Sequence, residues 1–131
     1  MTLIDELLYA LDGEAAMAGD AATVHLDAVL AKIRRCGPNE RLRVLTQLTR
    51  LHDEAALDAR AAEARRVAAS AKVREWEDRV IGSSGDLRTQ ASERVEAARA
   101  NAVAVAEEVA EYRATVERLA EVRALIASAG G

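Results

Sequence analysis

Few residues in this chain have side chains suited to nucleophilic or metal chemistry, and those few stand far apart. The single cysteine, Cys36, lies beside Arg34 and Arg35, a setting that can make a thiol more reactive. The two histidines, His25 and His52, have no second ligand at the three- or four-residue spacing that a metal site on a helix would need. Nucleophilic catalysis requires a base beside the nucleophile and a third group that orients the base, and the sequence suggests no such set.

Carboxylate pairs and glycine patterns add no further chemistry. Glu108 and Glu111 share a helix face, but no histidine accompanies them, so we interpret them as solvated side chains. No glycine pattern matches a phosphate-binding loop. The sequence therefore predicts a protein that is not an enzyme and that needs no cofactor and no metal ion.

The composition favours long helices. Half of the 131 residues are hydrophobic, but 30 of them are alanine, and the chain has no phenylalanine and one tryptophan. Alanine, leucine, glutamate and arginine are strong helix formers, and a mixture rich in them is typical of coiled coils and long helices. A lone cysteine fits a reducing compartment, and no apolar run approaches the roughly 18 residues that span a bilayer. We therefore expect a protein of the cytoplasm, or of a particle assembled there, without membrane contact.

Glycine and proline residues divide the chain into four expected helices. Two short helices, separated at Gly19-Asp20, fill an N-terminal segment that ends before Gly37-Pro38. Two long helices follow, joined by the turn Gly82-Ser83-Ser84-Gly85. The expected segments are 1–36 and 37–131, with the first short helix over 3–11, the long helices over 38–81 and 86–128, and the turn at 82–85. The predicted fold class is all-α: two short N-terminal helices followed by a long antiparallel helical hairpin that resembles a coiled coil.

The two long helices carry apolar stripes that match when the chain folds back at the turn. The second long helix, 86–128, follows a heptad repeat, with Val95, Val109 and Arg123 among its a positions. An antiparallel hairpin pairs residue i with about 167 − i, so that Val73 meets Val95 and Leu48 meets Leu119. The predicted helix–helix interface comprises Leu48, Leu51, Ala55, Ala62, Val73, Trp76, Val95, Val105, Val109, Tyr112, Val116 and Leu119. Arg66 and Asn101 fall opposite each other and form the expected polar pair that fixes the register.

Apolar residues also occur away from this interface. They are Leu57, Ala61, Ala64, Ala68 and Val103. A helix that is apolar on two sides is usually covered on two sides, and a two-helix hairpin with an alanine-rich interface has little core of its own. We therefore expect these residues to contact other copies of the chain, in a homo-oligomer, or another helical protein.

The segment from Gly85 to Val95 supports a different hypothesis. Gly85, Arg88, Ala91 and Val95 resemble the turn and recognition helix of helix-turn-helix regulators, although Asp86 and Leu87 depart from that pattern. The resemblance implies DNA contacts by Arg88, Gln90 and Arg94. The hairpin interpretation explains more of the chain, and the net charge of −4 disfavours nucleic acid as a partner.

Three functional hypotheses follow. The first is a structural or adaptor protein that self-associates or binds a partner protein through its alanine- and valine-rich helices, as a component of a larger assembly such as a phage particle. The alternative is a helix-turn-helix transcriptional regulator that dimerises through its C-terminal heptads. In the third, the acidic N-terminal helix, Leu3 to Leu11, docks in a partner's groove.

Overall fold

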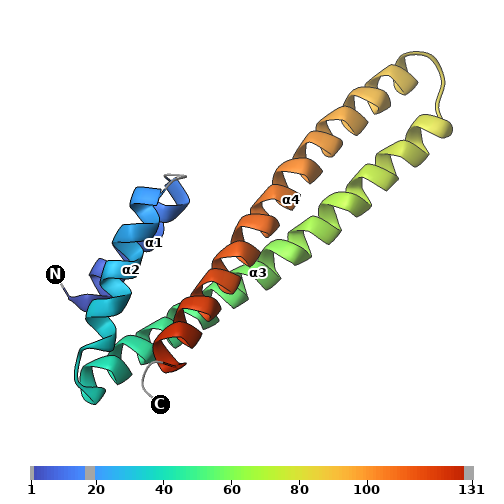
Figure 1. The fold of residues 1–131 in the computed structure, drawn as a ribbon. Helices are drawn as coiled ribbons and strands as arrows, with labels where there is room; N and C mark the ends of the chain where they lie inside the picture. The colour runs from blue at the N-terminus through green and yellow to red at the C-terminus, as the bar shows by residue number, and fades with distance from the viewer. Residues whose placement is uncertain (1, 17–19, 129–131) are drawn as a thin grey trace. The chain divides into compact units, whose positions relative to one another are not determined.

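The computed structural model describes residues 2–16 and 20–128, and this part of the chain is entirely helical apart from its connections. Four helices follow one another, as Figure 1 shows: α1 (Leu3–Ala16), α2 (Asp20–Arg34), α3 (Pro38–Ile81) and α4 (Gly85–Ser128). The long helices α3 and α4 pack against each other as an antiparallel hairpin. The predicted fold class is confirmed; the predicted break at Gly19 lies outside the described residues.

The start of α1 is fixed by a capping arrangement that the sequence interpretation overlooked. The hydroxyl oxygen of Thr2 accepts a hydrogen bond from the backbone N–H of Asp5 at 3.3 Å, and the Asp5 carboxylate accepts one from the backbone N–H of Thr2, also at 3.3 Å. Such reciprocal bonds satisfy backbone donors that a helix start leaves without partners. The bonds from Thr2 also lower the pKa of Asp5. The helix then continues to Ala16, past the predicted end at residue 11, because one internal glycine costs a helix only about 1 kcal/mol.

Glycine and proline residues explain the connection between α2 and α3 and the connection between α3 and α4. Pro38 is the first residue of α3, a position where its missing N–H leaves no hydrogen bond unmade. At the hairpin turn the backbone N–H of Gly82 donates the last helical hydrogen bond of α3, to the carbonyl of Asp78 at 3.1 Å. Gly85 has a φ of 63°, a left-handed conformation that glycine adopts without strain, and α4 begins there, one residue before the predicted start.

The contacts of the chain divide it into two compact units, and this division differs from the predicted segments 1–36 and 37–131. One unit, which we call the four-helix unit, contains the described residues up to His52 and those from Arg118 onward. The other, the two-helix unit, is Asp53–Glu117. The sequence interpretation placed the boundary at the Gly37-Pro38 loop. The contacts instead group the first turns of α3 and the last turns of α4 with α1 and α2.

The four-helix unit has a core of large aliphatic side chains. Its buried residues are Leu7, Ala10, Leu26, Val29, Leu30, Ile33, Val44, Leu48, Leu119, Val122 and Ile126. Val122 is fully buried whereas Arg123 is exposed, so the predicted a position at Arg123 is wrong. An arginine cannot be buried without a partner for its charge, and the neighbouring valine takes the inward position.

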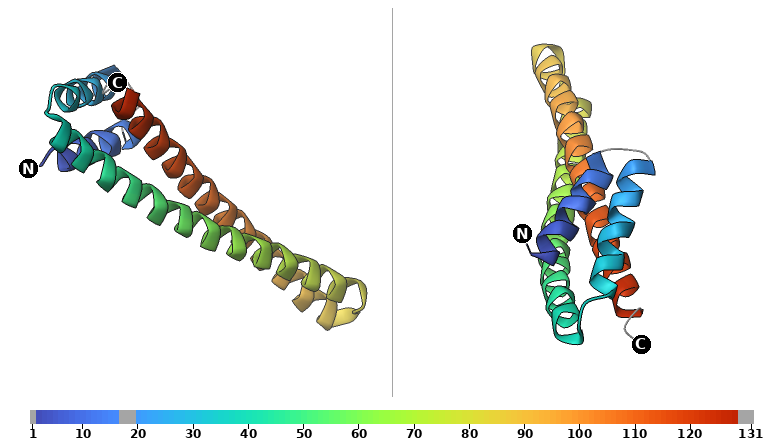
Figure 2. Two further views of the ribbon diagram at one scale, coloured as in Figure 1. Left: turned by 90° about the horizontal axis from the view of Figure 1, so that it is seen from below. Right: turned by 60° about the vertical axis from the view of Figure 1, so that its left-hand side comes forward.

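The two-helix unit has a thinner core made of small residues. Here α3 and α4 run side by side, as the two views in Figure 2 show. The buried residues of this unit are Ala62, Ala69, Ala91, Val95 and Val109. Small side chains at such an interface let two helices approach closely, but they bury little apolar area.

Candidate interaction surfaces

The residues predicted for the helix–helix interface all lie on inward-facing positions. Leu48, Ala62, Val95, Val109 and Leu119 are buried. The others are half-buried: Leu51, Ala55, Val73, Trp76, Val105, Tyr112 and Val116. Within the two-helix unit, buried and half-buried residues of α3 recur at alternating steps of three and four, from Ala59 through Ala62 and Arg66 to Val80. This is the spacing of a heptad repeat.

Ion pairs between α3 and α4 border this interface. Arg65 contacts Glu108 at 2.7 Å, and Arg113 contacts Glu63 at 3.2 Å. Exposed pairs of this kind each contribute little to stability, typically below about 1 kcal/mol. Because the pairs join residues far apart in sequence, they favour one register of the hairpin over shifted ones.

The position predicted for a polar pair holds a different interaction. The Arg66 guanidinium donates to the Glu63 carboxylate, with Nε at 2.8 Å from Oε2, and Arg113 donates to the same carboxylate from α4. Asn101 is exposed, and no hydrogen bond joins it to Arg66 among the described residues. The hydrogen bond from Arg66 lowers the pKa of Glu63, and the same bond raises the pKa of Arg66. A cluster of one carboxylate and two guanidinium groups therefore occupies the middle of the hairpin.

Near the turn, the single tryptophan lies between two arginines. The guanidinium carbon of Arg79 is 4.3 Å from the centroid of the Trp76 ring, and that of Arg94 is 5.4 Å away. Each cation–π contact of this kind contributes about 0.5–1 kcal/mol at an exposed site. Arg94, one of the predicted DNA contacts, thus has a structural partner across the hairpin. The other two, Arg88 and Gln90, are exposed on the first turns of α4.

The residues predicted to contact another protein are all exposed. Leu57 on α3 has 62% of its surface exposed and Val103 on α4 has 59%, and Ala61, Ala64 and Ala68 are exposed on α3. Val67, which is 56% exposed, is a further exposed apolar residue of α3. The sequence interpretation missed it because it considered alanines that follow the stripe of Leu57. A heptad count from Arg60 would have found it, since Arg60, Val67 and Arg74 occupy one heptad position.

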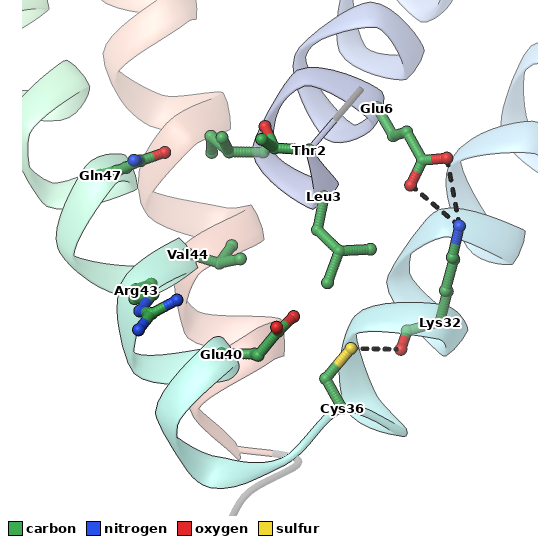
Figure 3. A pocket seen from close by; sticks show the side chains of 10 residues that line it. Thr2, Leu3, Glu6, Lys32, Cys36, Glu40, Arg43, Val44 and Gln47 are labelled. Atoms are coloured by element: carbon green, nitrogen blue, oxygen red, sulfur yellow. Dashed lines mark hydrogen bonds and ion pairs between the residues drawn. The ribbon is translucent and has the colours of Figure 1, made fainter.

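The four-helix unit contains a pocket of about 590 Å³ between the first turn of α1, the end of α2 and the start of α3. Figure 3 shows the Glu6 carboxylate paired with the Lys32 ammonium at 3.1 Å, and the Cys36 thiol donating to the Lys32 carbonyl at 3.3 Å. Its lining also includes Leu3, Ile4, Glu40, Arg43, Val44 and Gln47. The charges are mixed and partly paired, and the thiol has no neighbouring histidine in this lining, so the pocket resembles a surface hollow more than a catalytic site.

Other side chains that could take part in catalysis or metal binding do not gather into a site among the described residues. His25 is exposed and meets the Tyr9 ring edge-on, with centroids 6.2 Å apart. Within residues 2–16 and 20–128, no three His, Cys, Asp or Glu side chains gather into a group that could hold a metal ion. In the same part of the chain, none of the helices combines the length and the apolar character needed to cross a bilayer.

Comparison with models of protein families, with curated protein sequences and with solved structures finds no match for this chain. The function is therefore inferred from the surfaces of the molecule.

Proposed function

We propose that this protein is a non-enzymatic structural or adaptor protein that acts through helix–helix contacts, with other copies of itself or with another helical protein. One observation carries the proposal: Leu57, Val67 and Val103 are exposed in a unit whose inward positions are already filled. Large apolar side chains that are exposed on the outer faces of helices are typical of surfaces that another protein covers.

The small core of the two-helix unit supports the same proposal. Its buried residues are three alanines and two valines, and a pair of helices with so little buried apolar area is marginal by itself. Further contacts on the outer faces would add the missing burial. Repeated contacts of this kind suit a component of a larger assembly, such as a phage particle, formed in the cytoplasm.

Self-association is tested by light scattering with size-exclusion chromatography over a concentration series. We expect the wild-type chain to gain mass with concentration. We expect the double variant Leu57→Asn with Val103→Asn to remain smaller at the same concentration, with unchanged helix content by circular dichroism. Leu42→Asn is the matched control, because Leu42 is 63% exposed but belongs to the four-helix unit. A wild-type chain that stays monomeric at high micromolar concentration and captures no partner contradicts the proposal.

Duplex DNA binding is not proposed as a second function. A helix-turn-helix reader needs a recognition helix that crosses its neighbour and enters the major groove, whereas the residues after the turn belong to a 44-residue helix that lies antiparallel to α3. A salt-dependent DNA mobility shift that Arg88→Ala abolishes would restore that alternative.

A further inference from the structure

The outer face of α3 in the two-helix unit carries regularly spaced cations. Arg60, Val67 and Arg74 occupy one heptad position and are all exposed, with Leu57 and Ala64 on the adjacent outward position. The two arginines are two heptads apart, which is about 21 Å along a helix. This face therefore presents an alanine and a valine between two positive charges, with Leu57 one turn before the first charge.

The outer face of α4 carries the opposite charge with the same spacing. Glu93, Ala100 and Glu107 occupy one heptad position and are all exposed, with Val103 and Ala110 on the adjacent outward position. The two glutamates are again two heptads apart. This face therefore presents small apolar residues between two negative charges.

The two faces match in spacing as well as in sign. When residue i of α3 in one copy is set beside residue 167 − i of α4 in another copy, each outward residue meets a fitting partner. The matched outward pairs are Leu57 with Ala110, Arg60 with Glu107, Ala64 with Val103, Val67 with Ala100, and Arg74 with Glu93. Within one chain these charges form no ion pair among the described residues, so the match is available between chains.

The four charged side chains at these positions have no interaction partner among the described residues. Among the residues that the structure describes, Arg60, Arg74, Glu93 and Glu107 take part in no ion pair and no side-chain hydrogen bond. Neighbouring charges differ, since Arg65 pairs with Glu108 within the hairpin. An arginine and a glutamate that are exposed and unpaired are available to a second copy.

We propose that the outer face of α3 in one copy binds the outer face of α4 in a second copy, with the two hairpins pointing the same way. This inference rests on the proposed self-association and specifies its geometry. In the contact, Arg60 and Arg74 meet Glu107 and Glu93 of the neighbouring copy, while Val67 and Leu57 meet its alanines. The apolar residues supply burial, and the charges select the register and exclude contacts of a face with itself.

A contact between two different faces has a consequence for the size of the assembly. The faces belong to different helices of the hairpin, so each copy that binds one neighbour through one face still has the other face free. Such heterologous contacts build closed rings or open arrays rather than isolated dimers.

Charge reversal tests the proposal through four samples of the full chain, three variants and one mixture. The first is Arg60→Glu with Arg74→Glu, and the second is Glu93→Arg with Glu107→Arg. The third sample is an equimolar mixture of these two, and the fourth is the variant that combines all four substitutions. Each double variant alone places like charges in the contact and should weaken association by at least about tenfold. The mixture and the fourfold variant restore opposite charges at every contact and should recover the wild-type mass in light scattering.

A matched control separates this effect from a change in net charge. Arg34→Glu with Arg35→Glu reverses two exposed arginines in the four-helix unit and should leave association unchanged. All substituted positions are exposed, and circular dichroism verifies that helix content is kept.

The remaining outcomes overturn the geometry. Association that persists in both double variants, a mixture that does not co-assemble, or an assembly that stops at a dimer would each be incompatible with it. If Leu57→Asn with Val103→Asn abolishes association while charge reversal does not, self-association stands and this register is wrong. A wild-type chain that stays monomeric overturns the inference outright and leaves the proposed function only in its form with another protein.

Discussion

The two units of this chain are held together by side chains of different size. In the four-helix unit the fully buried residues include Leu7, Ile33 and Leu48, whereas the two-helix unit buries alanines and two valines. Both units use the same two long helices, so helix propensity does not account for the difference.

The number of neighbouring helices explains the contrast. Two helices can share only one stripe each, and small residues along that stripe let the backbones approach closely. Four helices surround a volume that only large side chains fill without cavities. Residue size along α3 and α4 therefore follows the number of helices packed around each stretch. The four-helix unit should therefore be destabilised most by the loss of side-chain volume, and the two-helix unit by added volume.

The largest expected effect is the loss of a large side chain from the four-helix unit. Leu48 is fully buried, so Leu48→Ala should lower the free energy of unfolding by about 3 kcal/mol through lost burial and a residual cavity. Leu42→Ala is the control on the same helix, because Leu42 is 63% exposed and its truncation should change stability little. Urea unfolding followed by circular dichroism measures both. Equal losses in the two variants would show that the buried core of this unit is misassigned.

The two-helix unit should be sensitive to added volume instead. Ala62 is fully buried, so Ala62→Leu should force α3 and α4 apart and cost about 2 kcal/mol. Ala61→Leu is the control one residue away, because Ala61 is exposed. Trp76 is the only tryptophan of the chain and lies in this unit, so its fluorescence reports the unfolding of the two-helix unit specifically. Stability that is unchanged in Ala62→Leu would contradict a close-packed interface.

The turn of the two-helix unit gives a smaller expected effect. Gly85 has a φ of 63° and no atom within 4 Å of the place where a Cβ would stand, so Gly85→Ala meets backbone strain without a clash. The expected loss is about 1 kcal/mol. Gly82→Ala is the control in the same turn, because a Cβ there would make only ordinary contact with the Asp78 carbonyl at 3.7 Å. A larger loss in the control than in Gly85→Ala would contradict this reasoning.

The hairpin could be predicted from the sequence because its signals are local and repeated. The heptad spacing and the turn Gly82-Ser83-Ser84-Gly85 place both long helices, and the observed bounds of α3 are the predicted ones. Each apolar position along a stripe repeats the same information, so one exception at Arg66 did not disturb the prediction.

The parts that could not be predicted depend on neighbours distant in sequence. Nothing local distinguishes Val122 from Arg123 as the inward residue, because the choice follows from the three other helical segments of the four-helix unit. The polar pair expected between Arg66 and Asn101 likewise assumed that Arg66 must bond across the hairpin. The carboxylate of Glu63, one turn away on the same helix, offers Arg66 a stronger charge-assisted acceptor than a neutral amide does.

This Glu63 cluster gives the smallest expected effect, because its side chains are partly exposed. Arg66 lowers the pKa of Glu63 by donating a hydrogen bond to its carboxylate. A group whose pKa is lower in the folded state adds stability above its ordinary pKa, and this stability is lost as the pH falls through the folded-state pKa. Glu63→Gln should therefore be less stable than wild type at neutral pH. The difference should shrink as the pH falls below the ordinary pKa of glutamate, about 4.3, and vanish at a pH where glutamate is protonated in both states.

The measurement is urea unfolding followed by Trp76 fluorescence across a pH series. Glu117→Gln is the control, because Glu117 is exposed and has no ion pair among the described residues. A Glu63→Gln deficit that persists unchanged at low pH would show that the side chain stabilises the hairpin by packing rather than by charge. A deficit confined to neutral pH would instead mean that charge helps to stabilise the thin two-helix interface. The four-helix unit is stabilised instead by the packing of its large buried side chains.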